Sequence, residues 1–130
     1  MKKTTLNRRQ ILKSAAASLG VLTLRGFEVH ASAPFHFTHG VASGDPLSDR
    51  IILWTRLIPG SGEHKSVTCR WQVASDNQFE QIVSSGVAST SAEHDYTVKV
   101  DAKDLSSGTQ YYYRFISADV MSPVGMARTL

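Results

Sequence analysis

Residues 67–74 read VTCRWQVA, and this stretch decides the fold. Apolar side chains stand at every second position with polar ones between them: Val67, Cys69, Trp71 and Val73 against Thr68, Arg70 and Gln72. Because successive side chains of a strand point to opposite faces, the pattern predicts a strand that is buried on one face only. We expect the thiol of Cys69 and the ring of Trp71 to belong to a hydrophobic core.

Shorter segments of the same character lie on both sides of this strand. We expect strands over residues 49–57, 96–101, 111–116 and 124–129, and a weaker one over 79–84. Gly, Pro, Ser and Asp separate these segments, and no helical period of useful length follows Phe35. Many short strands with turn residues between them predict an all-β fold, an antiparallel β-sandwich over residues 35–130.

The segment LSSGTQY, residues 105–111, narrows this prediction. It resembles the corner before a late strand of fibronectin type III domains, where a Leu packs inward and a Gly takes the turn. A Tyr six residues after that Leu then hydrogen-bonds back across the corner. The expected fold is therefore an immunoglobulin/fibronectin type III-like sandwich. In the run Tyr111-Tyr112-Tyr113 we expect two core rings and one exposed ring rather than a binding surface.

The first 31 residues have the character of a cleavable export signal. A positive start, MKKTTLNRRQILK, leads into a mildly apolar stretch that is too short and too polar to span a bilayer. Residues 7–13 resemble the twin-arginine motif, with Arg8 and Arg9 as the pair; a general secretory signal with a chance arginine pair is the alternative. A small-x-small pattern favours cleavage after Ala31.

The export signal accounts for the charge of the chain. The 14 Lys/Arg and 11 Asp/Glu residues give a net charge of +3, but residues 32–130 hold only 8 basic against 10 acidic residues. The basic excess therefore belongs to the leader and gives no reason to expect nucleic-acid binding. We expect an exported protein, periplasmic or extracellular, that meets the twin-arginine translocase during export and keeps no stable membrane anchor. Its single cysteine excludes an internal disulfide.

Two strings near the start of the predicted domain resemble the opening of the alkaline phosphatase D (PhoD-like) family. They are FTHGVASGDP at residues 37–46 and ILWTRL at 52–57. Further matches follow in the same order: WQVASD at 71–76, YTVKV at 96–100, YRF at 113–115 and SPVG at 122–125. The resemblance covers residues 35–130, and the combination of the first two strings is more specific than either alone.

The resemblance implies that this region is the non-catalytic N-terminal domain of an exported phosphomonoesterase/phosphodiesterase. In that family a calcineurin-like metallophosphoesterase domain follows, which is expected to bind iron and calcium. Its Asp-x-His, Gly-Asp-x-x-x-Tyr and Asn-His-Asp motifs do not occur in this sequence. We therefore expect a fragment or truncated form with no cofactor and no catalytic residue of its own. Its expected partner is the catalytic domain, in cis or as a separate chain.

The segment GVASGDP is the one feature that packing does not fully explain. Gly40, Ser43, Gly44 and Asp45 form either a bulge or turn between the first two strands or a loop docked against the catalytic domain. The segment lacks the Gly-Lys-Ser/Thr ending of a phosphate loop. The mature histidines show no metal-ligand spacing, so we expect no metal site from His36, His39, His64 and His94.

A function from another class remains open, namely a free-standing exported fibronectin type III-like binding module. Exposed apolar surface separates the two hypotheses. A domain that stands alone should hide its last strand and the GVASGDP segment, whereas a domain that belongs to a larger enzyme should expose apolar side chains there. An autonomous small hydrolase is the residual third hypothesis.

Overall fold

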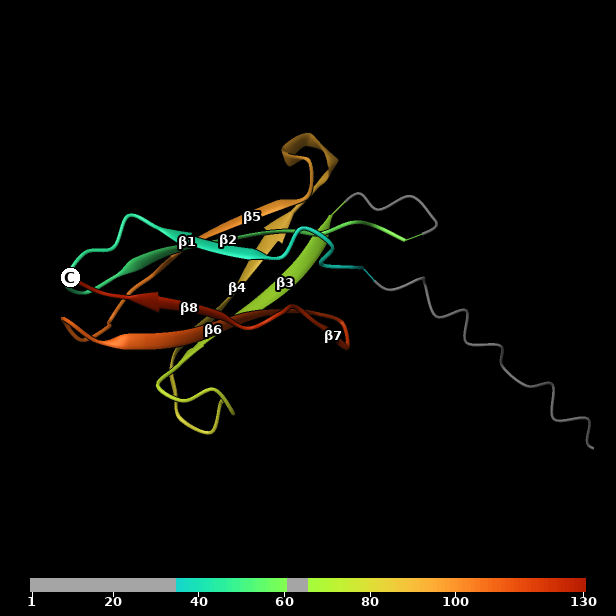
Figure 1. Ribbon diagram of the computed structural model, residues 1–130. Helices are drawn as coiled ribbons and strands as arrows, with labels where there is room; N and C mark the ends of the chain where they lie inside the picture. The colour runs from blue at the N-terminus through green and yellow to red at the C-terminus, as the bar shows by residue number, and fades with distance from the viewer. Residues whose placement is uncertain (1–34, 61–65) are drawn as a thin grey trace, which may run out of the picture. The chain divides into compact units, whose positions relative to one another are not determined.

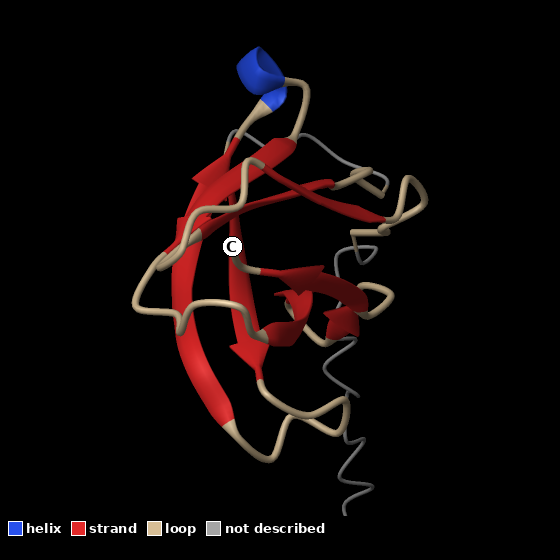
Figure 2. Cartoon of the chain, turned by 60° about the vertical axis from the view of Figure 1, so that its left-hand side comes forward, coloured by secondary structure: helices blue, strands red, loops and turns tan. Residues whose placement is uncertain are grey.

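A computed structural model describes residues 35–60 and 66–130. These residues form strands in two antiparallel sheets that share one core, an arrangement consistent with a β-sandwich (Figures 1 and 2). The predicted all-β class is thereby confirmed. The twin-arginine pair, the cleavage site after Ala31 and His64 lie outside the described residues. Within the described part of the chain, no helix is long and apolar enough to cross a membrane.

The first sheet has three strands in the order β1-β2-β5. They are β1 (Val41–Gly44), β2 (Ile51–Arg56) and β5 (Thr97–Ala102), and all pairs are antiparallel. In β2 the side chains of Ile51, Leu53 and Thr55 are buried, whereas those between them are half-buried. This alternation follows from the strand's period of two and gives the sheet one face toward the core.

The second sheet has five strands around β3 and β6. Its members are β3 (Val67–Ala74), β4 (Ile82–Thr90), β6 (Gln110–Ser117), β7 (Val120–Met121) and β8 (Gly125–Arg128). β3 lies between β4 and β6, and the other edge of β6 pairs first with β8 and then with β7. A 3₁₀ turn, η1 (Ala92–His94), links β4 to β5 and so carries the chain from this sheet to the first one (Figure 2).

Residues from both sheets fill the space between them. The largest fully buried side chains are those of Phe115, Leu53, Leu57, Val73, Val98, Thr55, Cys69 and Ser117. Burial raises the pKa of the Cys69 thiol to about 11, so this sulfur is an inert core group. Trp71 is half-buried against the same core, and its ring occupies the space that a Cβ at Gly86 would need. Cys69 is a core side chain, as the alternating pattern predicts, and Trp71 packs against the core while part of its ring stays exposed.

The corner before β6 has the predicted geometry. Leu105 and Tyr111 are buried, and Gly108 takes a positive φ of 62°. The backbone N–H of Ser106 donates to the Tyr111 hydroxyl oxygen at 2.8 Å. Tyr111 and Tyr113 are buried, so the two predicted core rings are confirmed, whereas Tyr112 is half-buried rather than exposed.

The strand expected over residues 79–84 is wrong in its bounds. β4 runs from Ile82 to Thr90, and Phe79 lies before it with a positive φ of 61°. The ring of Phe79 is buried beneath the Arg114 guanidinium, which lies 4.0 Å from the ring centroid. Most residues of the stretch SSGVAS, 84–89, have low β-propensity, so the sequence pattern does not predict this strand. The strand forms because β3 pairs with it along its whole length.

Candidate functional site

The segment GVASGDP is mostly strand, so its interpretation as a bulge or turn is wrong for residues 41–44. These residues form β1, an edge strand in which Val41 lies opposite Thr55 and Gly44 opposite Ile52. Positive φ angles occur only at the two ends of the segment, 69° at Gly40 and 46° at Asp45. Short edge strands tolerate glycine and small residues. Because turns have a similar composition, the sequence alone does not distinguish this strand from a turn.

Gly40 is a glycine that the backbone requires. It ends a turn in which its N–H donates to the carbonyl oxygen of Phe37 at 3.2 Å. Its own carbonyl oxygen accepts the hydroxyl of the fully buried Thr55 at 2.8 Å. The turn is thus fixed to the last residues of β2, and a residue with a Cβ would be strained at its φ of 69°.

Gly44 has neither of the properties that make a glycine necessary. Its φ lies outside the left-handed region, and a Cβ built there meets nothing within 4 Å. No described residue of this chain therefore approaches the backbone here so closely that a glycine is needed. Gly44 is exposed at the end of β1, where the side of the sheet away from the core is open.

Ser43 connects the two sheets at the edge of the sandwich. Its side chain shares a hydrogen bond with the phenol of Tyr113, while burial raises the pKa of that phenol. The Tyr113 ring lies directly over Gly125 of β8, where an added Cβ would stand 2.6 Å from the hydroxyl oxygen. Ser43, Tyr113 and Gly125 thus close the edge where β1 and β8 meet, and Ser43 has a structural role.

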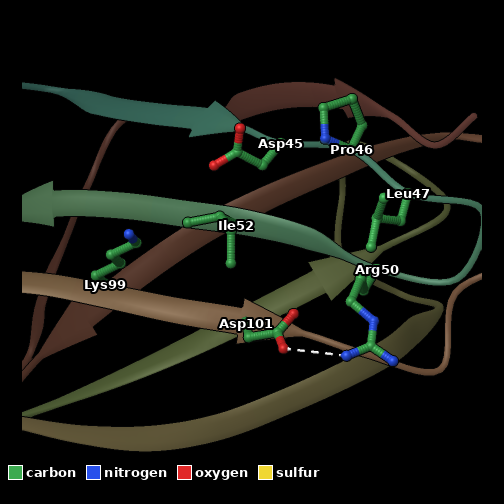
Figure 3. A pocket seen from close by; sticks show the side chains of 7 residues that line it. All are labelled: Asp45, Pro46, Leu47, Arg50, Ile52, Lys99 and Asp101. Carbon is green, nitrogen blue, oxygen red and sulfur yellow. Dashed lines mark hydrogen bonds and ion pairs between the residues drawn. The ribbon is translucent and has the colours of Figure 1, made fainter.

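A pocket opens beside the loop that follows β1 (Figure 3). Asp45, Pro46, Leu47 and Arg50 line it from the loop, and the outward side chains of Ile52, Lys99 and Asp101 line it from β2 and β5. We call this site the loop pocket; its volume is about 500 Å³. Its lining combines an apolar floor with cations and carboxylates.

The charges of the loop pocket are unevenly matched. Arg50 pairs with Asp49 at 3.1 Å and with Asp101 at 3.4 Å, and its guanidinium lowers the pKa of the Asp49 carboxyl. Lys103 also reaches Asp101, at 3.5 Å. Over residues 35–60 and 66–130, by contrast, no ion pair engages Lys99. Asp45, which also lines the pocket, takes part in none of these ion pairs either, so one ammonium and one carboxylate of the lining have no ion-pair partner among the described residues.

The last described residues are fixed beside this loop. The Leu130 N–H donates to the carbonyl oxygen of Leu47 at 3.1 Å, and the Leu130 carbonyl oxygen accepts from the Gly108 N–H at 2.9 Å. Thr129 is buried, and its hydroxyl oxygen accepts the Thr109 N–H at 3.0 Å. Figure 1 shows the C-terminus next to the loop between β1 and β2 and near the start of β6. The chain end, the corner and the loop pocket thus form one structural unit.

Comparison with known proteins identifies the family of this sandwich. The family model described as the PhoD-like phosphatase, N-terminal domain, matches residues 24–130. The chain belongs to this family. Alkaline phosphatase D from Bacillus subtilis (strain 168) is 41% identical over 141 residues, which cover 97% of this chain but 24% of that protein. The resemblance seen in the sequence motifs is therefore confirmed.

Two solved structures share the fold of this PhoD-like domain. One is described as the structure of PhoD; it has a TM-score of 0.70 and 43% identity, over 77% of this chain and 20% of that one. The other is a shortened form of the sensor domain of the anti-sigma factor RsgI4 from Pseudobacteroides cellulosolvens; it has a TM-score of 0.50 and 14% identity, over 75% of this chain and 96% of that one. The second likeness concerns the fold alone. The PhoD-like chain thus spans about a quarter of the length of the curated relative it matches.

The donor groups of this PhoD-like domain do not suit metals such as the iron and calcium that the family resemblance implies for the catalytic domain. No group of three His, Cys, Asp or Glu residues in the described part of the chain could hold a metal ion. His39 lies between Thr38, whose hydroxyl is 3.2 Å from Nδ1, and Arg56, whose Nη1 is 3.5 Å from Nε2. Arg56 in turn pairs with Asp95 at 2.7 Å, so the polar groups around this imidazole form a surface network without metal-ligand geometry.

The sequence motifs identify the segment beside the loop pocket but few of the residues that line it. Of the candidate residues Gly40, Ser43, Gly44 and Asp45, only Asp45 lines it. Lys99 and Asp101 were recognisable as the polar face of an alternating strand. Their position beside Leu47 depends on the pairing of β5 with β2, which the sequence does not reveal.

Proposed function

We propose that this chain is the N-terminal, non-catalytic sandwich domain of an exported alkaline phosphatase D-like phosphomonoesterase/phosphodiesterase, and that it supports and orients a metal-dependent catalytic domain. The observation that carries the proposal is the 41% identity to alkaline phosphatase D across 97% of this chain, in a match that takes up only 24% of the relative. The family model that matches is itself described as an N-terminal domain.

The surface of the sandwich supports a role as part of a larger enzyme. Large apolar side chains are exposed near the last strand and at the loop after β1. Met126 is 65% exposed, Leu130 68% and Leu47 51%. Met126 lies on the last strand, one of the two regions that a free-standing binding module should hide, whereas Leu47 directly follows the GVASGDP segment, which is the other region. Their exposure therefore favours a supporting domain over that alternative.

The corner geometry supports a finer assignment of the fold as immunoglobulin/fibronectin type III-like. The hydrogen bond from the Ser106 N–H to the Tyr111 hydroxyl oxygen has the form of a tyrosine corner, which is a hallmark of such sandwiches. The links from β2 to β3 and from β4 to β5 also cross between the two sheets, as in Greek-key sandwiches. Neither feature involves a catalytic group.

Export and cofactors complete the proposal. Arg8 and Arg9 would direct the chain to the twin-arginine translocase, with cleavage after Ala31 and release to the periplasm or the exterior. Iron and calcium would belong to the catalytic domain, in cis or in a separate chain, because the described residues of this sandwich offer no donor cluster. In this proposal, residues of this domain take no part in phosphate ester hydrolysis.

The supporting role can be tested by exchanging the domain within a complete enzyme. In one variant of Bacillus subtilis alkaline phosphatase D, residues 35–130 of this chain replace the matching segment; in another, that segment is deleted. We expect the exchange to retain phosphatase activity and the deletion to lose both activity and soluble yield. Full activity per folded molecule after the deletion would show that the catalytic domain needs no sandwich.

A further inference from the structure

We propose that the loop pocket, together with the exposed side chain of Leu130, is the surface on which the catalytic domain of the same polypeptide docks. This inference rests on the proposed function and deepens it by naming the contact surface. The occupant to which we commit is a segment of the downstream domain that presents an apolar side chain beside a carboxylate. The argument uses the path of the chain, the exposed apolar groups and the charge of the pocket.

The path of the chain brings the downstream domain to this end of the sandwich. The matched family model is an N-terminal domain, and about three quarters of the curated relative lies outside the match. Leu130 is held by its own N–H to Leu47 and by its carbonyl oxygen to Gly108 and to the Ser107 hydroxyl, at 2.9 Å and 2.6 Å. A polypeptide that continues from this residue must leave the sandwich next to the loop pocket.

The apolar groups at this end are exposed on a rigid framework. Leu47 and Leu130 are 51% and 68% exposed although a backbone hydrogen bond joins them. The Leu47 N–H is itself held by the carbonyl oxygen of Arg50, and the Asp49 carbonyl oxygen accepts the Leu105 N–H. Exposed leucines on a fixed loop are preorganised for contact, since little conformational entropy is lost when they are covered.

The charge of the pocket specifies the chemistry of its occupant. Asp49 and Asp101 pair with Arg50, whereas Lys99 and Asp45, which also line the pocket, take part in no ion pair of the described residues (Figure 3). A carboxylate from the docked segment would pair with Lys99, and an apolar side chain would cover Leu47 and Ile52 on the floor. The volume of about 500 Å³ exceeds that of any single side chain, so more than one residue can enter.

The outer face of the five-stranded sheet is the competing surface, and its features fit docking less well. Val87 and Met126 are 64% and 65% exposed there. The centre of this face is covered, however, by Arg114, which lies over Phe79 and donates to the Gln72 side chain at 2.8 Å. This face provides a matched control, because Val87 is an exposed apolar residue on β4, a strand that contributes no side chain to the loop pocket.

The test measures which side chains become covered when the sandwich belongs to a complete enzyme. Leu47→Cys and, as control, Val87→Cys are introduced into the 130-residue chain and into the alkaline phosphatase D that carries residues 35–130 of it. Maleimide labelling is followed by peptide mass mapping, and the buried native Cys69 serves as an internal reference. We expect Cys at 47 to react more than about tenfold more slowly in the enzyme than in the chain, as for a site that reacts only on local opening. Cys at 87 should react equally in both.

Each other outcome has a definite meaning. Equal labelling at position 47 in chain and enzyme, or protection of position 87 instead, overturns the proposal. Protection at position 47 already in the isolated chain, together with dimerisation, also overturns it by showing that a second copy is the occupant. If a cysteine variant does not fold, hydrogen exchange of residues 45–50 in the unmodified chain and enzyme decides by the same comparison. An enzyme that stays active without its sandwich would refute the supporting role, whatever the labelling shows.

Discussion

Replacing Tyr111 by Phe isolates a single hydrogen bond of the corner. The substitution keeps the ring that packs in the core and removes only the hydroxyl oxygen, to which the Ser106 N–H donates at 2.8 Å. The amide of Ser106 is then left in a partly buried position without its acceptor. We therefore expect Tyr111→Phe to destabilise the sandwich although no apolar contact is lost.

The magnitude follows from the environment of that amide. Leaving a buried donor unsatisfied costs about 1–3 kcal/mol, and the part-buried site here places the loss near the lower end, at about 1–2 kcal/mol. For a domain of roughly a hundred residues, each kcal/mol corresponds to a fall of about 4–8 °C in melting temperature. The expected change is thus well outside the error of a urea or thermal unfolding experiment.

The neighbouring tyrosine provides the control. The Tyr112 hydroxyl accepts only a side-chain hydrogen bond, from exposed Gln110 at 3.2 Å, and both groups can turn to water instead. Tyr112→Phe should therefore change the free energy of unfolding by less than about 0.5 kcal/mol. Equal effects of the two substitutions, or no loss from Tyr111→Phe, would refute the idea that the corner hydrogen bond stabilises this fold.

Four further predictions concern single positions. Gly125→Ala should cost about 1–3 kcal/mol in urea unfolding because its Cβ meets the Tyr113 ring. Gly44→Val should leave the stability of the chain nearly unchanged, since the space there is open, yet lower activity in an alkaline phosphatase D that carries this domain; equal activity per folded molecule contradicts this. Cys69 should resist a thiol reagent at pH 8 until the chain unfolds, because its thiol pKa is about 11; rapid labelling of the folded chain would disprove its burial. The Asp76 carboxylate accepts three backbone N–H groups, led by that of Gln81, which lower its pKa below 3.8. Its contribution to stability is complete above that pH and is lost as the pH falls through the lowered value, so Asp76→Asn should flatten the acid limb of the stability profile.

The residues that alternate most cleanly were also the most predictable. The strand at 67–74 has the bounds that the pattern gives, and the corner at 105–111 forms the hydrogen bond that the resemblance implies. Both depend on local signals, namely a period of two and a Leu-Gly-Tyr spacing. Such signals can be read from the sequence because packing in the core restricts which side chains can stand at each position.

The missed elements depend on tertiary pairing. β1 consists of Val, Ala, Ser and Gly, and β7 has two residues, so neither carries a pattern that distinguishes it from a turn. They are strands because β2 and β6 offer them free edges. The loop pocket depends on the same information, since Lys99 and Leu47 meet only after β5 pairs with β2.

The most direct test of the central claim is the phosphatase activity of the chain cleaved after Ala31. Purified residues 32–130 are assayed on a chromogenic phosphate monoester and on a diester, with iron and calcium added. The account predicts no turnover, because the described residues bring no donor cluster together. Turnover that follows the protein through purification and disappears with a chelator would contradict it, and would mean that this domain carries a catalytic site of its own.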